Sequence, residues 1–286
     1  MPFASSRLLP ALAALSAFVA LAGCATPGEP VGAPRKETLL AVTDGGDLIR
    51  FNAGQPQRVL ARRPLQGLPA GETLVGMDFR VARGVLYTLS SGGRLYTLDT
   101  STAKLTPVGN GAAVALSGSV YGVDFNPVAD RVRVVSDSGL NLRLHPDTGA
   151  VAATDPELQY AVGDMRAGQR PRIAAAGYTY NKKNDKLTTN YAIDIAAGML
   201  VTLGSKEGVE PAVSPNTGRL MTVGALGTGA LDDASLDISD LDNTAFAALR
   251  RAGHTRLVLV DLASGRATDL GTLADGGAIR GLAIEP

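Results

Sequence analysis

The 286-residue sequence has no tryptophan, one cysteine and two histidines, and aromatic residues make up only 5% of it. Because Cys24 is the only cysteine, no disulfide can form within the chain. His145 and His254 each stand in a turn-like context without a second His or Cys at ligand spacing, which argues against a zinc site. The sequence also lacks a Gly-x-Ser-x-Gly elbow. A hydrolase with a histidine-activated nucleophile is therefore not expected.

An excess of one charge is missing as well, since 27 basic residues balance 27 acidic ones. No local basic patch predicts a nucleic-acid partner. Hydrophobic residues make up 45% of the chain, which excludes a disordered class. Glycine is abundant, with 34 residues, and suits a fold with many tight turns.

A repeated unit organises the chain. The stretch from Leu74 to Gly109 contains four short apolar runs separated by turn signals, as in a four-stranded antiparallel meander. Its segment Gly-Met-Asp-Phe, beginning at Gly76, recurs as Gly-Val-Asp-Phe beginning at Gly122. Looser copies begin at Ala176 and Ser235. This alignment gives equivalent places to Asp78, Asp124, Thr179, Asp237 and Ala283.

The two ends of the repeat region complete one another. Arg280 to Ile284 has the pattern of a first strand, and the runs beginning at Thr38, Leu48 and Arg58 have the patterns of the other three. Four strands per unit, with a period of roughly 40 to 50 residues, are the signature of a β-propeller. We expect an all-β fold over residues 38–286, a β-propeller of five four-stranded blades closed by pairing of the N- and C-terminal strands. Six blades are the alternative, because the third and fourth units are long.

The first 23 residues predict a lipoprotein signal peptide. Arg7 precedes an apolar run from Leu8 to Ala20 that is short for a membrane span. The following Leu-Ala-Gly-Cys resembles the lipobox of bacterial lipoproteins, in which the cysteine, here Cys24, is lipidated. An ordinary signal peptide with a chance cysteine is the alternative.

The residues after this cysteine predict where the protein is located in the cell. Residues 24–37, rich in proline and small residues, are expected to form a flexible tether between the lipid and the domain. Residue 25 is Ala rather than Asp, which by resemblance to lipoprotein sorting favours the outer membrane. We therefore expect a lipid-anchored protein of the bacterial cell envelope, facing the periplasm or the surface.

The repeat itself supplies the first candidate site. If the Gly-x-Asp run is the innermost strand, side-chain alternation turns Asp78, Asp124 and Asp237 towards the axis. A ring of carboxylates could hold Ca²⁺ or another hard cation through oxygen ligands. The alternative is structural, with each aspartate accepting hydrogen bonds between neighbouring blades. The Asp-rich segment from Leu231 to Asp242 lacks EF-hand spacing and favours an inter-blade loop.

Two adjacent strands supply the second candidate. Alternation places Arg131 and Arg133 on one face of their strand, and Asn141 with Arg143 on one face of the next. Guanidinium groups so arranged could bind a carboxylate or phosphate ligand. The alternative is a solvated or blade-to-blade face, whose arginines pair with Asp130, Asp137 or Asp147.

Several of these motifs resemble one bacterial family. Tyr-Gly-Val-Asp-Phe-Asn-Pro, Asn-Leu-Arg-Leu-His-Pro-Asp-Thr-Gly and Ser-Pro-Asn-Thr-Gly-Arg-Leu resemble the family catalogued as domain of unknown function 4394. The resemblance covers about Thr38 to Ile284 and implies propeller-like repeats, but it brings no established activity, substrate or catalytic residue. The third repeat has Tyr-Thr-Tyr-Asn in place of the Asp-Phe pattern, so the blade boundary there stays open.

Two classes of function remain after these exclusions. The first is a non-enzymatic, lipid-anchored propeller that binds an envelope protein, a glycan or another envelope component. The second is a metal-dependent propeller enzyme acting on a sugar, lactone or ester, with Asp78 and Asp124 holding the ion. A scaffold that only spaces an assembly is a third, weaker hypothesis.

Overall fold

The computed structural model describes residues 1, 3 and 29–286 of the chain. The predicted lipidation site Cys24, most of the signal peptide and the first part of the tether lie outside these residues. One compact unit runs from Val31 to Pro286. Among the described residues, no helix has the length and apolar character needed to cross a membrane.

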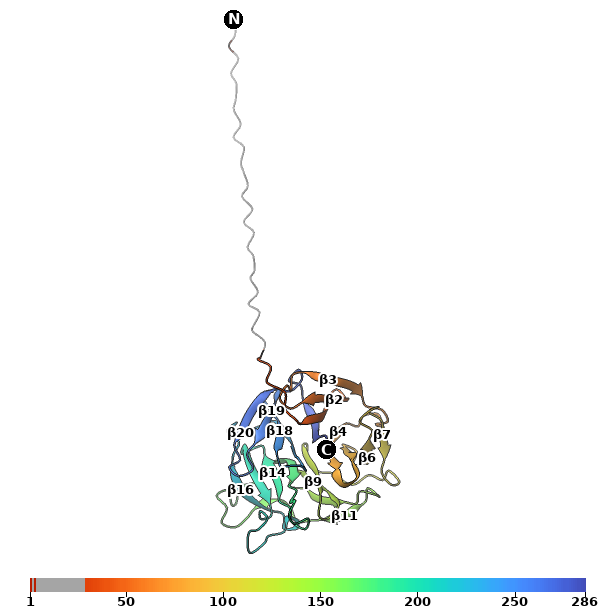
Figure 1. Ribbon diagram of the computed structural model, residues 1–286, viewed down its shortest axis with the longest axis vertical. Coiled ribbons are helices and arrows are strands. Elements are labelled where there is room, and N and C mark those ends of the chain that lie inside the picture. The colour runs from red at the N-terminus through yellow and green to blue at the C-terminus, as the bar shows by residue number, and fades with distance from the viewer. Residues whose placement is uncertain (2, 4–28) are drawn as a thin grey trace. The chain divides into compact units, whose positions relative to one another are not determined.

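Five sheets stand around a common centre in this unit (Figure 1). Blade 1 consists of β21 (Ile279–Ile284), β1 (Thr38–Thr43), β2 (Asp47–Asn52) and β3 (Val59–Pro64). Blade 2 consists of β4 (Leu74–Arg80), β5 (Val85–Ser90), β6 (Leu95–Leu98) and β7 (Leu105–Pro107). Blade 3 consists of β8 (Tyr121–Asn126), β9 (Arg131–Ser136), β10 (Asn141–Leu144) and β11 (Val151–Thr154).

The last two blades follow the same plan with one addition. Blade 4 consists of β13 (Ile173–Tyr178), β14 (Asn190–Asp194), β15 (Met199–Leu203) and β16 (Arg219–Ala225), and the short β12 (Gln159–Tyr160) pairs in parallel with β16. Blade 5 consists of β17 (Asp233–Ile238), β18 (Ala245–Arg251), β19 (His254–Val260) and β20 (Ala267–Thr272). Two single 3₁₀ turns, η1 (Val81–Arg83) and η2 (Pro215–Thr217), lie in connections. The prediction of a five-bladed β-propeller is confirmed.

The predicted closure of the ring is also confirmed. The C-terminal strand β21 pairs antiparallel with β1, so that Leu40 lies opposite Ala283 and Val42 opposite Gly281. The last strand of the chain is therefore the innermost strand of the first blade. Strand pairing thus joins the first and last strands of the chain within one blade and closes the ring.

The hydrophobic core lies between adjacent blades, and the inner strands approach one another closely. Leu, Val and Ala side chains fill most of it, with few rings, such as Tyr87 packed edge-on against Phe125 at 5.0 Å between centroids. A Cβ on Gly76 would lie 2.4 Å from Cγ2 of Val123 in the next blade. This position in β4 therefore needs glycine for steric reasons.

The compact unit begins before the predicted domain start at Thr38. The amide of Asn52 in β2 donates to the carbonyl oxygens of Arg35 at 2.7 Å and Glu37 at 3.2 Å. The guanidinium of Arg35 lies 5.6 Å from the ring centre of Phe246 in blade 5. The last part of the predicted tether is thus packed against the propeller.

Candidate functional site

The three predicted axial aspartates meet at the centre of the ring. Asp78 lies on β4, Asp124 on β8 and Asp237 on β17, and all three are buried. One carboxylate oxygen from each lies within 4.8 Å of the others. The structure therefore brings together the residues that the repeat pattern singled out.

These carboxylates bind backbone N–H groups of the innermost strands. Asp78 and Asp237 each accept one hydrogen bond from their own strand and one from the next blade. Asp124 accepts one hydrogen bond, which comes from the next blade. The donors are the amides of Phe79 and Phe125 to Asp78 (both 2.7 Å), of Tyr178 to Asp124 (3.0 Å), and of Ile238 and Ile284 to Asp237 (both 2.6 Å). Each of the five blades contributes one N–H group.

This pattern explains why three acids occur in a five-bladed ring. An innermost strand has no neighbour on its axial side, so its N–H groups there need another acceptor. Asp78 and Asp237 each serve two blades and Asp124 serves one, so all five N–H groups are bonded. Among the described residues, the second oxygen of Asp124 has no hydrogen-bond partner. Three of these bonds, from Phe125, Tyr178 and Ile284, cross between blades and are the inter-blade contacts expected as the alternative to a metal site.

Burial raises the pKa of all three carboxyl groups. Loss of hydration is the largest cause, and for Asp78 and Asp124 the charge of neighbouring carboxylates adds to it. The pKa of Asp237 rises to about 6, although its two backbone hydrogen bonds act in the opposite direction. Burial and the same three carboxylates also raise the pKa of the Tyr180 phenol. The cluster therefore favours a shared proton, and its hard oxygens also suit a cation such as Ca²⁺.

The third repeat is aligned differently from the sequence prediction. The N–H group that reaches Asp124 belongs to Tyr178, so Tyr178 takes the place of Phe79 and Phe125. Gly177, and not Thr179, is then equivalent to Asp78. The prediction was wrong by two residues. A shift of two preserves the inward face of a strand, so alternation could not reveal the error.

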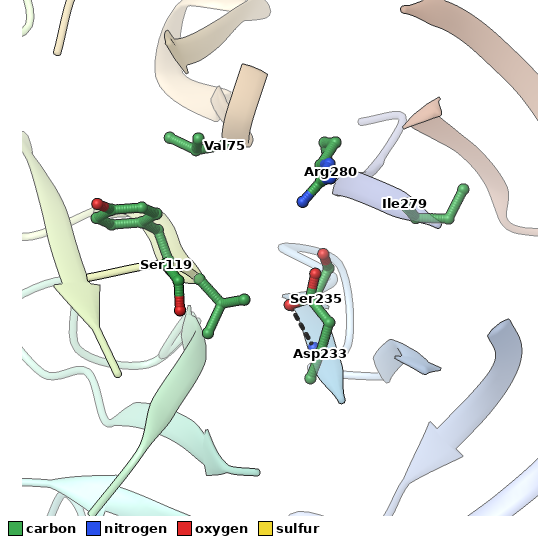
Figure 2. A pocket seen from close by; sticks show the side chains of 9 residues that line it. Val75, Ser119, Asp233, Ser235, Ile279 and Arg280 are labelled. Carbon is green, nitrogen blue, oxygen red and sulfur yellow. Dashed lines mark hydrogen bonds between the residues drawn. The ribbon is translucent and has the colours of Figure 1, made fainter. Parts of the chain in front are cut away.

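Two narrow cavities continue along the axis from the end where the inner strands begin. The inner one measures about 10 Å³ and is lined by all five innermost strands, including Gly76, Gly122 and Gly281. The outer one measures about 20 Å³ and lies between Val75, Ser119, Asp233 and Arg280 (Figure 2). Burial raises the pKa of Asp233 to about 6. Such cavities admit a water-sized molecule but no organic substrate.

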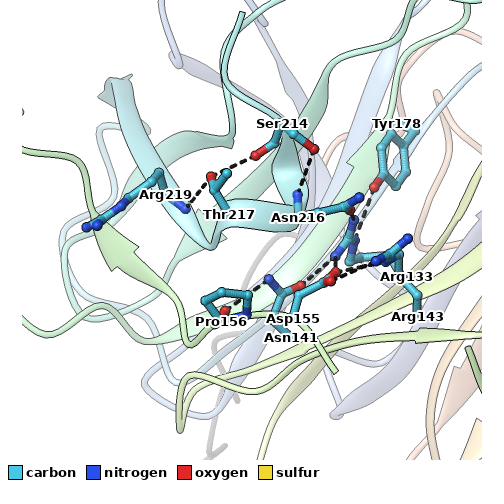
Figure 3. Close-up of polar contacts among 10 residues, drawn as sticks. All are labelled: Arg133, Asn141, Arg143, Asp155, Pro156, Tyr178, Ser214, Asn216, Thr217 and Arg219. Carbon is cyan, nitrogen blue, oxygen red and sulfur yellow. Dashed lines mark hydrogen bonds and ion pairs between the residues drawn. The ribbon is translucent and has the colours of Figure 1, made fainter. Parts of the chain in front are cut away.

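The predicted arginine patch lies between blades 3 and 4. Arg133 on β9 is only 1% exposed, and its guanidinium is surrounded by acceptors from both blades (Figure 3). These are Tyr178 Oη (3.1 Å), Asn141 Oδ1 (2.6 Å), Asp155 Oδ2 (2.7 Å) and Asn216 Oδ1 (2.6 Å). Arg133 and Asn141 thus meet as predicted, within a buried network that joins two blades.

Of the two other arginines of this patch, Arg143 shares Asp155 with Arg133 and Arg131 does not. Arg143 forms a bidentate pair with Asp155, at 2.9 and 2.8 Å. Arg131 donates to the carbonyl oxygens of Ala129 and Asp130. The carboxylate partner is therefore Asp155, which the sequence analysis did not consider. Asp130 and Asp147 bind Arg80 of blade 2 instead.

The structure also shows the Asp-rich segment and His145. The Asp-rich segment from Leu231 to Asp242 contains β17 (Asp233–Ile238), so half of it is strand and the prediction of a loop was wrong for that half. His145 lies in the predicted turn, where its Nδ1 accepts from the amide of Asp147 at 3.2 Å.

A groove between blades 4 and 5 was missed by sequence reasoning. It measures about 940 Å³. Its floor is formed by apolar side chains and its rim carries basic ones. The apolar residues are Leu226, Leu231, Leu249 and Val258, the basic ones are Arg251, His254, Arg256 and Arg266, and the acidic Asp269 lines the groove as well. These residues follow no motif of the repeat, so only their position in space reveals the groove.

Comparison with known proteins places the chain in a family. The family described as "Domain of unknown function (DUF4394)" matches residues 47–283. The chain belongs to this family. No curated protein matches the chain.

Solved structures resemble this DUF4394 chain only distantly. A hydrazine synthase of Kuenenia stuttgartiensis is 14% identical with a TM-score of 0.41, covering 74% of this chain and 54% of its own, so the chain spans about half of that protein. A protein of Bacteroides uniformis, provisionally assigned as a 6-phosphogluconolactonase, is 15% identical with a TM-score of 0.42, covering 85% and 84%. Myxococcus xanthus glutaminyl cyclase is 15% identical with a TM-score of 0.47, covering 82% and 100%. At this level of similarity, those proteins' activities say nothing about the DUF4394 chain.

The part of the chain that matches DUF4394 contains each site described above. Residues 47–283 include the three axial aspartates, the Arg133 network and the groove between blades 4 and 5. The first strand β1 lies before the matched region, although it belongs to blade 1. The family match thus covers most of the propeller, including nearly all of β21, and leaves out its pairing partner β1.

Proposed function

We propose that this DUF4394 chain is a ligand-binding module held by a lipid anchor at the bacterial cell envelope. The observation that carries the proposal is the groove between blades 4 and 5. Its volume of about 940 Å³ lies within the range of small-molecule sites, and its surface combines an apolar floor with a few polar groups. A small envelope ligand fits this surface better than the glycan or protein partner considered from the sequence.

The use of charge elsewhere in the molecule supports this assignment. The axial carboxylates and Arg133 form hydrogen bonds that connect neighbouring blades. Side chains of the groove rim, by contrast, include guanidinium groups without a partner among the described residues. Polar groups that the fold does not use are available for a ligand.

A cation at the axis is the second candidate role, favoured by the three oxygens within 4.8 Å of one another. Asp78, Asp124 and Asp237 would hold a hard cation such as Ca²⁺. The axial cavities of about 10 and 20 Å³ are too small for a sugar, lactone or ester. The role of such a cation would therefore be to stabilise the ring, and not to activate a substrate.

Ligand binding can be tested with a groove-filling variant. Ala225 is exposed at the end of β16 and lines the groove, so Ala225→Trp places a large ring there. Ala152→Trp is the matched control on β11, the outer strand of blade 3. The lipidated chain is produced in a bacterial host, extracted from envelopes in mild detergent and weighed by native mass spectrometry. We expect a non-covalent adduct on the wild type and on Ala152→Trp that is absent from Ala225→Trp.

The opposite results contradict the proposal. An adduct retained by Ala225→Trp would place the ligand elsewhere. Wild-type protein without any adduct in repeated extractions would remove the support for a ligand-binding role.

The anchor is tested separately through Cys24, which lies outside the described residues. Cys24→Ala should move the chain from the membrane fraction to the soluble fraction and abolish incorporation of labelled fatty acid. Cys24→Ala protein that stays in the membrane fraction would show that attachment does not depend on this cysteine.

A further inference from the structure

We propose that the groove between blades 4 and 5 binds an elongated ligand with an apolar middle and an acid group at each end. This inference rests on the proposed function, because it assigns a ligand class to the same groove. Three features of the groove support it: the position of its unpaired arginines, the character of its floor and the way in which its walls meet.

Two arginines of the rim have no hydrogen-bond or ion-pair partner among the described residues. Arg251 and Arg266 are both exposed and line the groove. Arg256 differs, since its guanidinium pairs with Asp269 and donates to Thr272 Oγ1 at 3.2 Å. Arg251 and Arg266 can therefore form charge-assisted hydrogen bonds with an anionic ligand.

The two unpaired arginines lie at opposite ends of β19. Arg251 pairs with His254 at the turn between β18 and β19. Arg266 lies at the other turn, where its carbonyl oxygen accepts from the amide of Asp261 at 2.9 Å. The seven residues of β19 separate the turn that holds Arg251 from the turn that holds Arg266, which is about 20 Å along the backbone. Both residues line the same groove.

The surface between these ends is largely apolar and also holds the Arg256–Asp269 ion pair, in which Asp269 lies opposite Val258. Leu249 and Val258 form the part of the floor that belongs to blade 5, and Leu226 and Leu231 form the part that belongs to the connection between β16 and β17. All four side chains are buried, so a ligand lies against a packed wall rather than against loose loops. Apolar groups of a ligand placed here would lose contact with water, at a gain of about 25 cal/mol per Å².

Backbone contacts between the two blades fix the walls. The amide of Ala267 donates to the carbonyl oxygen of Leu226 at 3.1 Å. A Cβ on Gly224 would lie only 2.0 Å from the carbonyl oxygen of Ser264, so blades 4 and 5 touch there through their backbones. The amide of Leu231 is bonded to Ile195 in blade 4 at 2.8 Å. The groove is therefore already formed without a ligand, which reduces the ordering cost of binding.

Chain length and charge can be varied independently to test this ligand class. The unit Val31–Pro286 contains all five blades and the closing strand, so it is used without the anchor. Calorimetric titrations compare decanedioate with decanoate, which lacks one acid group, and with pentanedioate, which lacks the long apolar middle. We expect decanedioate to bind at least about tenfold more tightly than either comparator.

Single variants at the two ends sharpen the test. Arg251→Gln and Arg266→Gln should each reduce the affinity for decanedioate about tenfold, towards that for decanoate. Arg58→Gln and Arg63→Gln remove the same charge from exposed positions near β3 and should leave the affinity unchanged. Thermal unfolding of each variant checks that the fold is retained.

Several outcomes would overturn the proposal. These are no binding of decanedioate, equal affinities for decanedioate and decanoate, or unchanged binding in both Arg251→Gln and Arg266→Gln. If Ala225→Trp still removes a natural ligand of another chemistry, the groove remains a binding site and only the ligand class is wrong. If Ala225→Trp removes none, the proposed function fails as well.

Discussion

Two groups of arginines lie between neighbouring blades and have opposite environments. Between blades 3 and 4, Arg133 is buried and bonded to four side chains, and Arg143 shares Asp155 with it. Between blades 4 and 5, Arg251 and Arg266 border a groove without a partner among the described residues. The first group connects the blades, whereas the second leaves its donors available.

The difference teaches that residue type alone does not identify a binding site in this ring. A strand pattern can place several guanidinium groups on one face, but the acceptors around them decide their role. The axial carboxylates follow the same rule, because one oxygen of each accepts an N–H group of an adjacent blade. Groups that the fold leaves unpaired are the stronger candidates for ligand binding.

Breaking the first arginine group should have the largest effect. Arg133→Met removes the centre of the network and leaves Asp155 with Arg143 as its remaining cationic partner. We expect a loss of free energy of unfolding on the order of 3 kcal/mol, measured by denaturant titration.

The matched control is Arg131→Met, two residues earlier on the same strand, where the guanidinium donates to two backbone carbonyl oxygens. It should lower the free energy of unfolding much less. Equal losses in the two variants would contradict a special role for the Arg133 network.

The axial aspartates should differ among themselves. Both oxygens of Asp78 accept N–H groups, so an amide in Asp78→Asn places its own NH₂ against a backbone donor. We expect a loss of about 1 to 3 kcal/mol in the free energy of unfolding. Asp124→Asn can keep its one bond to Tyr178 and removes a buried charge, so its effect should be smaller.

The same denaturant titrations test the axial cation. If Ca²⁺ stabilises wild type at neutral pH but neither of the two variants, the cluster holds a cation. If the two variants were destabilised equally, the hydrogen-bond account of the axis would be wrong.

The axial carboxyl groups should also make stability depend on pH, with a smaller effect than the substitutions above. The folded-state pKa of Asp237 is raised to about 6, and those of Asp78 and Asp124 are raised as well. The folded chain then binds more protons than the unfolded chain above about pH 4, so stability falls as the pH rises from there through about 6. Asp233, with a pKa of about 6, acts in the same direction.

We therefore expect the unfolding midpoint temperature to be higher at pH 5 than at pH 7. Asp124→Asn should flatten this difference, because it removes one buried carboxyl and its repulsion. A wild-type midpoint that rises steadily from pH 5 to pH 7 would contradict the assignment.

Much of the fold could be predicted from the sequence because a propeller repeats one local pattern. The Gly-x-Asp-Phe segments located the innermost strands, and the incomplete units at the two ends predicted the closing pair of β1 and β21. The third repeat was misaligned because Gly177 replaces the aspartate, which removes the marker of the pattern. The parallel strand β12 has only two residues and carries no recognisable signal.

The candidate sites were predictable only in part. The axial cluster follows from strand alternation around one centre, so its three aspartates could be named in advance. Asp155 and Asn216 come from connections between strands, and their positions depend on tertiary packing. The groove was missed for the same reason, because Leu226, Arg251 and Arg266 belong to different turns and strands.

The most direct test of the account measures stability and decanedioate affinity together in two variants. Arg133→Met should lower the free energy of unfolding and leave the affinity unchanged under conditions in which it is folded. The double variant Arg251→Gln, Arg266→Gln should lose affinity and keep the free energy of unfolding within about 0.5 kcal/mol of wild type. If both variants changed the same property, the separation between connecting arginines and binding arginines would be wrong.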